Sequence, residues 1–477
     1  MKKFLIVILF FSSFLTFGQN KKWTLEECVR HALENNISVK QSELQVELAD
    51  VSKRDALGNF LPTLNGSAMN AWNTGLTQNV TTGVLQSQTT RNSSYSVTAG
   101  LSLFNGLRNL RASQRAEIAK MAALYNLDKM KDDIALLVAN SYLQILLNKA
   151  NLEVALAQNR VTQEQLQRTE DLVDAGVLPR GDLLEIKATD AAEKQKIAVS
   201  ENAVSISLIS LAQILLIKDY ENFDIVDSDF EISPSDLVDR PVEEIIQAAF
   251  ENRPEVKISE NRVELAQKDL QLSRSEYYPS LNGFFNYNTR ESGADRILQG
   301  GIDPNRPTMP IGVVESTGEV VVAPNFALIA APPLPFFDQL SQNDGISYGV
   351  QLNIPVFNGL AVRNNVKRRT IELRNTEYEL EQAKLDLESN VYQALVDVKG
   401  ALKAYEAAEV ALESQELAHQ YASDRFEVGL TPAFDFSQSK QRLENARIEL
   451  NRSKFDYIFK LKVLELYFGI SPDQLKL

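Results

Sequence analysis

The sequence predicts a mainly α-helical chain that also carries four β-strands of membrane-crossing length. Three observations predict this fold class. The chain repeats its own pattern once, and two segments alternate strictly between apolar and polar residues, each with a less regular partner segment. In addition, two proline-free stretches of some 69 residues, at 107–175 and 360–428, carry apolar residues in steps of seven, interrupted in the first stretch by Lys131 and Asn159.

Composition excludes several classes of function. The chain has 49 basic and 63 acidic residues, which argues against nucleic acid as its main partner, because phosphate binding needs clustered Lys and Arg. His31 and His419 lie far apart without metal-ligand or triad spacing, so we expect no enzyme, metal or cofactor. Cys28 is expected to be a small packing residue. No apolar run of membrane-helix length is expected after the N-terminus.

The first residues have the layout of a secretory signal peptide. Lys2 and Lys3 precede an apolar run at 4–11, and small residues follow at 16–18. We therefore expect a signal peptide at 1–18 and a mature chain from Gln19. An uncleaved signal anchor is the alternative, although the apolar run is shorter than a full membrane span.

Short motifs that recur along the chain indicate an internal duplication of the sequence. Pro-Thr-Leu-Asn-Gly at 62–66 recurs as Pro-Ser-Leu-Asn-Gly at 279–283, an offset of 217 residues. Phe-Asn-Gly-Leu at 104–107 recurs at 357–360, an offset of 253 residues. The second copy therefore holds 36 more residues than the first, all between its two motifs.

This repeat sets the predicted domain organisation. We expect a first structural repeat at 19–230 and a second at 231–477, each with a helix, a strand pair and a long helical hairpin. The 36 extra residues fall in a long, proline-rich loop at 291–345. The corresponding loop of the first copy, at 73–94, is rich in Thr, Gln and Asn. Both loops are expected to be extracellular if the strands cross a membrane.

Strands are predicted between the helical parts. Residues 94–103 and 346–354 alternate strictly, and their less regular partners lie near 63–72 and 280–289. Each is about ten residues long, the length of a tilted membrane strand, with apolar residues outside and uncharged polar residues inside. Strand pattern alone also allows a soluble sandwich.

The helical parts argue against a sandwich. Residues 24–60 are predicted as a helix with a break near Asn35 and Asn36. Each proline-free stretch would form a rod about 100 Å long, which no soluble domain of ordinary size requires. Each rod is expected to turn back into a second helix, near 182–216 and 435–468, after a glycine and a proline.

Four strands cannot close a membrane barrel, and an open edge in lipid leaves backbone groups unsatisfied. We therefore expect a homo-oligomer. Three chains supply a 12-stranded β-barrel that continues into an α-helical coiled-coil barrel. A dimer is also possible on strand count, but the strand ends must lead into a wide helical tube.

These features resemble the TolC-like outer membrane efflux channels of Gram-negative bacteria. The resemblance covers nearly all of the mature chain and includes the junction at 355–359 and the far hairpin at 428–435. It implies a homotrimer in the cell outer membrane that extends into the periplasm as a passive exit duct. The implied partners are outer membrane lipid, a periplasmic adaptor (membrane fusion) protein and an inner-membrane transporter of the RND, ABC or MFS type.

The resemblance also implies a periplasmic gate. By position relative to the hairpin glycines, the family's acidic constriction falls on Asp435 and Gln438, and on Asp182 and Glu185 in the first copy. The same residues fit the D-x-x-E/Q form of a helix capping box, so both readings stay open. Thr431 stands where one branch of the family has a gate-locking arginine.

The hairpin tips are the expected docking site for the adaptor. They expose small and apolar residues, namely Gly176, Val177 and Leu178 in the first copy and Val428, Gly429, Leu430 and Thr431 in the second. Cargo is expected to be small molecules (drugs, toxic compounds or metals) or polypeptides, chosen largely by the partners. The alternative function is a non-conducting, periplasm-spanning structural or adhesive stalk.

Overall fold

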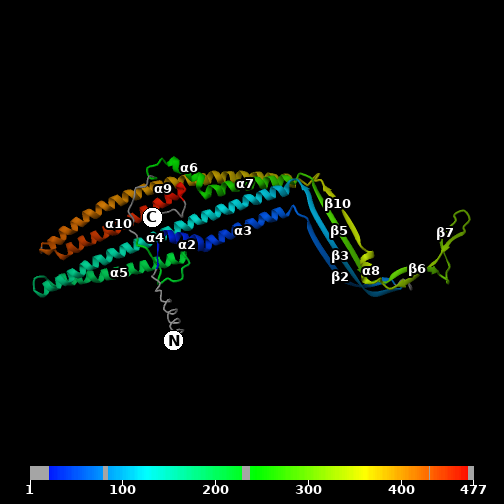
Figure 1. The fold of residues 1–477 in the computed structure, drawn as a ribbon, viewed down its shortest axis with the longest axis horizontal. Helices are drawn as coiled ribbons and strands as arrows, with labels where there is room; N and C mark the ends of the chain where they lie inside the picture. The colour runs from blue at the N-terminus through cyan, green and yellow to red at the C-terminus, as the bar shows by residue number, and fades with distance from the viewer. Residues whose placement is uncertain (1–20, 79–83, 228–236, 429, 471–477) are drawn as a thin grey trace, which may run out of the picture. The chain divides into compact units, whose positions relative to one another are not determined.

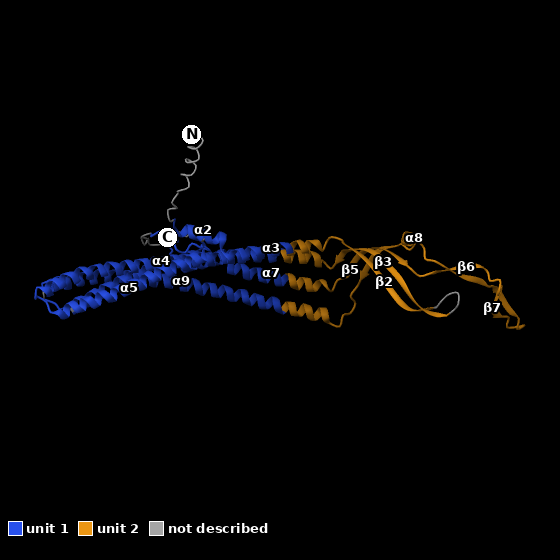
Figure 2. Ribbon diagram, turned by 90° about the horizontal axis from the view of Figure 1, so that it is seen from below, with its two compact units in different colours: residues 1–51, 117–267, 371–477 blue, residues 52–116, 268–370 orange. Residues whose placement is uncertain are grey.

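The computed structural model describes residues 21–78, 84–227, 237–428 and 430–470. The expected signal peptide at 1–18 lies outside these residues. The chain forms two compact units, coloured separately in Figure 2. Unit 1 comprises residues 1–51, 117–267 and 371–477, and unit 2 comprises residues 52–116 and 268–370. Each unit therefore draws on both halves of the chain.

Eight helices longer than ten residues account for most of the described chain (Figure 1). In the first half they are α2 (Leu25–Asn35), α3 (Ile37–Gly58), α4 (Arg108–Asp174) and α5 (Arg180–Ile214). In the second half they are α6 (Val242–Asn252), α7 (Pro254–Ser275), α9 (Ala361–Glu427) and α10 (Ala433–Phe468). The break at Asn36 and the two long rods are confirmed, since α4 and α9 are each 67 residues long.

The four alternating segments lie in one antiparallel sheet. Its strands, in spatial order, are β10 (Gly345–Asn353), β5 (Ser280–Ser292), β3 (Leu85–Asn105) and β2 (Thr63–Gln78). The register aligns an apolar row across all four strands: Tyr348, Phe285, Ala99 and Leu64. The next row is polar: Ser347, Asn286, Thr98 and Asn65. Because paired residues point to the same side, one face is apolar and the other is polar.

The two segments that were expected to be extracellular loops contain regular strands. In the first segment, residues 73–78 and 85–94 are strand, because β2 and β3 stay paired as far as Gln78 and Leu85. Their Thr and Ser side chains pair across the strands, as in the 2.7 Å contact between the hydroxyls of Thr74 and Thr89. Such polar pairs stabilise a ribbon without apolar alternation, which is why composition alone suggested a loop.

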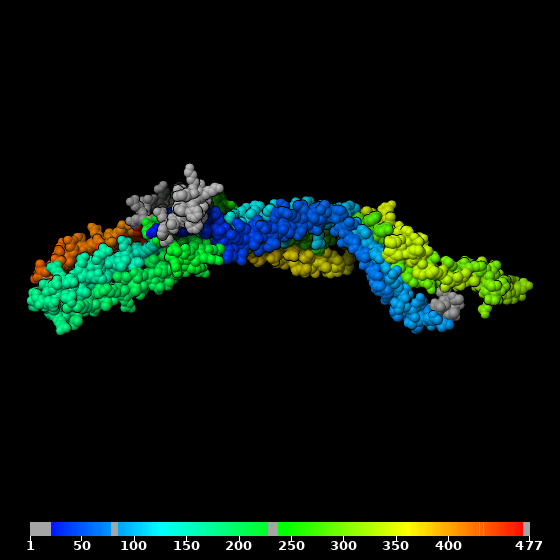
Figure 3. All heavy atoms as spheres, turned by 60° about the horizontal axis from the view of Figure 1, so that its bottom comes forward, coloured from blue at the N-terminus to red at the C-terminus, as the bar shows by residue number. Residues whose placement is uncertain are grey.

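The longer segment at 291–345 also has regular structure. It contains two strand pairs, β6 (Arg296–Ile302) with β9 (Phe326–Ala331) and β7 (Thr308–Val313) with β8 (Val320–Pro324). A short helix, α8 (Phe336–Gln342), follows. In Figure 3 the yellow-green atoms of β7 and β8 form the far end of unit 2. The apolar side chains of these ribbons are largely exposed in the single chain.

The core of unit 1 forms where helices meet two short strands, β1 (Lys22–Trp23) and β4 (Asp224–Ile225). Tyr142 of α4 is 1% exposed, and its hydroxyl donates to the carbonyl oxygen of Val226 at 3.0 Å. Cys28 is fully buried in the same cluster, as expected, and burial raises the pKa of its thiol to about 12. A buried tyrosine with a bonded hydroxyl fixes α4 against the strands.

One helix departs from the sequence-based expectation. Among the described residues, α5 is long and apolar enough to cross a membrane by length and composition. Only 11% of its most apolar 18-residue window is buried within the chain. Val199 and Ile206, seven residues apart in that part of α5, are both largely exposed. This spacing is that of a coiled-coil seam, which explains the apolar window without a membrane span.

A buried ion pair joins the two halves of the chain within unit 1. Arg253, at the junction between α6 and α7, donates to Asp132 of α4 at 2.8 Å and to Glu255 at 2.9 Å, and its side chain is only 6% exposed. Burial raises the pKa of Asp132 although the Arg253 charge opposes the rise. Removing one partner of such a pair leaves an uncompensated buried charge.

We predict that Arg253→Ala lowers the free energy of unfolding by about 3–5 kcal/mol at neutral pH. The loss relative to the unaltered protein should shrink as pH falls, because protonation of Asp132 removes the unpaired charge. Denaturant unfolding followed by circular dichroism measures both effects. Arg262→Ala, at an exposed position on α7, is the matched control. Equal losses for the two variants would contradict the prediction.

Candidate functional site at the helical hairpin tips

Two helical hairpins of unit 1 carry the predicted site. The first joins α4 to α5, and the second joins α9 to α10. Gly176 ends the first rod with φ of 72°, and its N–H donates to the carbonyl oxygen of Val173. This left-handed conformation favours glycine, and Pro179 then precedes the first turn of α5. The expected glycine stop and proline restart are confirmed here, while Gly429 of the second tip lies outside the described residues.

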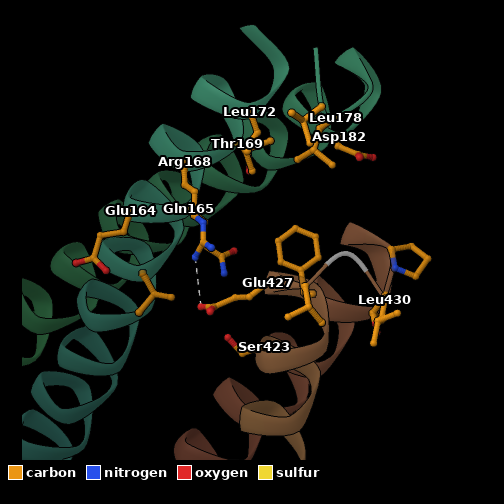
Figure 4. A pocket seen from close by; sticks show the side chains of 16 residues that line it. Glu164, Gln165, Arg168, Thr169, Leu172, Leu178, Asp182, Ser423, Glu427 and Leu430 are labelled. Carbon is orange, nitrogen blue, oxygen red and sulfur yellow. Dashed lines mark ion pairs between the residues drawn. The ribbon is translucent and has the colours of Figure 1, made fainter. Parts of the chain in front are cut away.

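The tips of the two hairpins line a common groove of about 870 Å³ (Figure 4). The predicted tip residues that line it are Val177, Leu178, Val428, Leu430 and Thr431. Val177, Val428 and Leu430 are 66–70% exposed. An exposed apolar rim on a groove is a feature of surfaces that bind other proteins.

The four predicted gate residues do not cap their helices. The N-cap residues are Pro179 and Pro432, neither of which makes a side-chain capping bond. Asp182 and Asp435 lie instead within the first turn, where a carboxylate interacts favourably with the helix dipole. The capping-box interpretation is therefore wrong for both. Asp182 lines the groove, whereas Glu185, Asp435 and Gln438 are exposed.

An ion pair crosses the groove between the two hairpins. Arg168 of α4 lies 3.4 Å from Glu427 of α9, shown as a dashed line in Figure 4. Both side chains are more than half exposed, so the pair contributes at most about 1 kcal/mol. Thr431 lines the same groove as this pair.

A stronger connection lies further from the tips. Lys440 of α10, with a side chain only 5% exposed, donates to Glu193 of α5 at 2.9 Å and to the hydroxyl of Thr162 of α4. Thr162 in turn donates to the other oxygen of Glu193. Burial lowers the pKa of Lys440, and Glu193 opposes the change. The three residues join one hairpin to the other.

Aromatic rings pack beside this connection. Phe436 stacks on Phe426 with a centroid separation of 5.0 Å, and the ring of His419 lies 5.3 Å from Phe436. Burial lowers the pKa of His419, and the charges of Lys440 and Arg447 lower it further. The Nδ1 atom of His419 is buried without a hydrogen-bond partner among the described residues.

Sequence reasoning missed the Lys440 connection. A lysine on a helix is ordinarily an exposed residue, and its acidic partner is 247 residues away in the chain. The one available signal is that Lys440 is five residues after Asp435 and flanked by polar residues, which is too weak to single it out.

Comparison with known proteins agrees with this architecture. Residues 28–215 and 245–465 match the sequence model of a family described as outer membrane efflux protein. The matched segments cover most of the chain. The chain belongs to the outer membrane efflux protein family. Members of this family are channels rather than enzymes, and this protein is accordingly an outer membrane channel protein that extends into the periplasm.

Two curated relatives are similar to the chain. It is 21% identical over 353 residues to outer membrane protein TolC of Vibrio cholerae, covering 72% of this chain and 68% of TolC. It is 20% identical over 336 residues to the alkaline protease secretion protein AprF of Pseudomonas aeruginosa. That match covers 70% of this chain and 60% of AprF, which is less than two thirds of AprF's length.

Solved structures of family members share the fold. The Campylobacter jejuni outer membrane channel CmeC matches with a TM-score of 0.74 and 14% identity, over 96% of this chain and 87% of CmeC. CusC matches with a TM-score of 0.72 and 17% identity, over 95% of each chain. Among the described residues, no group of three or more His, Cys, Asp or Glu side chains is placed to hold a metal ion.

We predict that Glu193→Gln weakens the connection that Lys440 makes between the two hairpins. Lys440 then stays buried without its anionic partner, which should lower the free energy of unfolding by about 3–5 kcal/mol. The loss should shrink as pH rises, because the neutral form of Lys440 needs no partner. Hydrogen exchange in α10 should become faster.

Glu170→Gln is the matched control, because Glu170 forms an exposed pair with Lys187 of the same hairpin. Its effect should not exceed about 1 kcal/mol. If both substitutions change hydrogen exchange equally, the buried connection has no special role.

Proposed function

We propose that the protein is a homotrimeric channel that serves as the passive exit duct of a tripartite efflux or secretion system. Three copies form a 12-stranded barrel in the outer membrane, which continues into an α-helical coiled-coil barrel in the periplasm. Small molecules (drugs, toxic compounds or metals) or polypeptides pass from the periplasm to the exterior. One observation carries the proposal: the four-stranded sheet has two open edges.

The open edges require further strands. Within the described residues, β2 and β10 each pair on one side only. In a bilayer, an unpaired strand edge leaves N–H and C=O groups without hydrogen bonds, at a cost of several kcal/mol for each group. Pairing β2 of one copy with β10 of the next removes every edge. Three copies then supply the twelve strands that the proposal needs.

Uncovered heptad stripes on the helices support the same assembly. On α9, Ile371, Tyr378, Leu385 and Tyr392 recur every seven residues and are 42–70% exposed. On α3, Ile37, Leu44 and Val51 do the same at 51–56% exposure. A seven-residue apolar stripe is a coiled-coil seam, and it needs a facing helix. Neighbouring copies provide these helices in a helical barrel.

We assign the periplasmic gate to Asp435 and Gln438 of α10, with Asp182 and Glu185 of α5. The exposed side chains of Asp435 and Gln438 support this assignment, because neither is occupied in capping its helix. Three-fold symmetry would place three Asp435 carboxylates around one axis. Such a ring attracts cations into a narrow pore and disfavours anions.

The partners follow from the hairpin tips and from the relatives. The tips present exposed Val177, Val428 and Leu430 around a groove, which suits docking of a periplasmic adaptor protein. An inner-membrane transporter of the RND, ABC or MFS type then supplies energy and selects cargo. AprF is named for the secretion of alkaline protease, so the polypeptide class of cargo has a precedent among the relatives.

We also propose that the mature chain consists of two structural repeats, at 19–230 and 231–477. The helices α4 and α9 have equal length, and α5 and α10 have 35 and 36 residues. The ribbons β6 to β9 account for the additional length of the second repeat, since Arg296–Ala331 spans 36 residues. Each repeat contributes one strand pair to the sheet.

Single-channel recording in a planar bilayer tests the duct. We predict discrete, cation-preferring conductance for the purified protein, and a lower potassium-to-chloride permeability ratio for Asp435→Asn, because the charged ring is lost. Glu221→Gln, at an exposed position between α5 and β4, should keep the original ratio.

Two results would count against the proposal. Absence of current from protein that is folded and inserted would support the non-conducting stalk instead. Conductance with an unchanged permeability ratio in Asp435→Asn would keep the duct but remove Asp435 from the gate.

A further inference from the structure

We propose that α8 is an interfacial helix, held on the lipid-facing side of the barrel at the extracellular membrane boundary, with Phe337 in contact with outer-leaflet lipid. This inference rests on the proposed function, because it takes the apolar face of the four-stranded sheet as the face toward lipid. The partner that contacts the exposed Phe337 side chain is therefore lipid, rather than water or a neighbouring copy of the chain.

Hydrogen bonds fix α8 to the end of β5. The hydroxyl of Thr289 donates to the carbonyl oxygen of Leu340 at 2.7 Å. The side chain of Gln339, which is 7% exposed, accepts from the N–H of Ser292 at 2.9 Å and donates to the Ser292 carbonyl at 3.0 Å. Asn343 donates to the carbonyl oxygen of Arg290 at 2.9 Å. The helix is therefore held in place although it has only seven residues.

The same contacts place α8 on the apolar face of the sheet. Tyr95 and Thr289 are paired residues of β3 and β5, two positions along from the apolar pair Val97 and Tyr287. Side chains two positions apart share a face. The ring of Phe336 contacts Tyr95 edge-on at 6.2 Å, and Thr289 bonds to α8, so α8 lies over this face.

The sheet carries charged and polar side chains next to the residues that bind α8. Ser93 and Glu291 lie on the otherwise apolar face, yet each is only 4% exposed. Arg91 and Ser93 both donate to the Glu291 carboxylate, at 2.5 and 2.9 Å. A charged pair on the membrane-facing side of a sheet must be shielded from the hydrocarbon of the bilayer. The helix is bonded directly beside this pair, at Thr289 and Ser292.

Strand length places this polar patch at the edge of the bilayer. From Leu281 to Glu291, β5 advances ten residues along the same face. At about 3.3 Å per residue and a tilt of about 40°, this distance spans about 25 Å, the height of the apolar band of an outer membrane barrel. The helices of the chain attach at the Leu281 end, so α8 lies at the extracellular end.

The remaining surface of α8 suits the headgroup region. Phe336, Gln339, Leu340 and Asn343 follow the spacing of one helix face and meet the sheet. Asp338 and Ser341 lie on the opposite face and are exposed. Phe337 lies on a flank and is 79% exposed. A polar back with an exposed aromatic flank is typical of an interfacial helix, and aromatic girdles mark both boundaries of membrane barrels.

Nitroxide spin labels test the proposal in the full-length protein in phosphatidylethanolamine–phosphatidylglycerol vesicles. The background is Cys28→Ala, which removes the single cysteine. Labels at Phe337→Cys, Ser341→Cys, Val350→Cys and Thr317→Cys are compared by their collisions with oxygen and with water-soluble nickel–EDDA. Val350 lies on the apolar face of β10, and Thr317 lies in the turn between β7 and β8.

The expected result is an oxygen-to-nickel collision ratio at 337 several-fold above the ratios at 341 and 317, and closer to that at 350. A ratio at 337 equal to that at 317 means water contact and overturns the proposal. Low collision with both reagents at 337 means cover by protein, which also overturns it. If the label at 350 is not in lipid, the barrel assignment itself fails, so the two failures are distinguishable.

Discussion

The structure depends on one constraint, the need to pair every strand edge in a membrane. Within the part of the chain that the structure describes, the sheet of β10, β5, β3 and β2 pairs its interior strands on both sides but leaves its two edges open. In water such edges bind solvent, whereas in hydrocarbon each unpaired group costs several kcal/mol. The exposed heptad stripes of α3 and α9 present the same requirement in the helical part. The proposed assembly of three copies would meet both requirements, in the sheet and in the helical part.

Periodicity made much of the fold predictable from the sequence. Alternation at 94–103 and 346–354 identified β3 and β10, and the absence of proline identified α4 and α9, because each signal reports directly on backbone geometry. The strand ribbons at 73–94 and within 291–345 were missed. Their pairing depends on backbone bonds and on polar or two-sided apolar side chains, which leave no period in the sequence.

The candidate site was predictable in part. The glycine and proline signals located the α4–α5 tip, since Gly176 needs a positive φ. The D-x-x-E/Q pattern suggested caps, but prolines occupy the N-cap positions and place Asp182 and Asp435 within the first turn of their helices. The buried contact of Lys440 with Glu193 had no sequence signal. The two residues are far apart in the sequence and meet only when the hairpins pack, so no local sequence pattern indicates their ion pair.

The most direct test of the central claim is the number of copies in the assembled channel. Native mass spectrometry of the detergent-extracted protein, together with class averages of single particles, measures this number and its symmetry. The account predicts a complex of three copies with three-fold symmetry, because three four-stranded sheets pair edge to edge. A monomer that stays folded in detergent, with β2 and β10 unpaired, would contradict the account and return the sheet to the soluble sandwich.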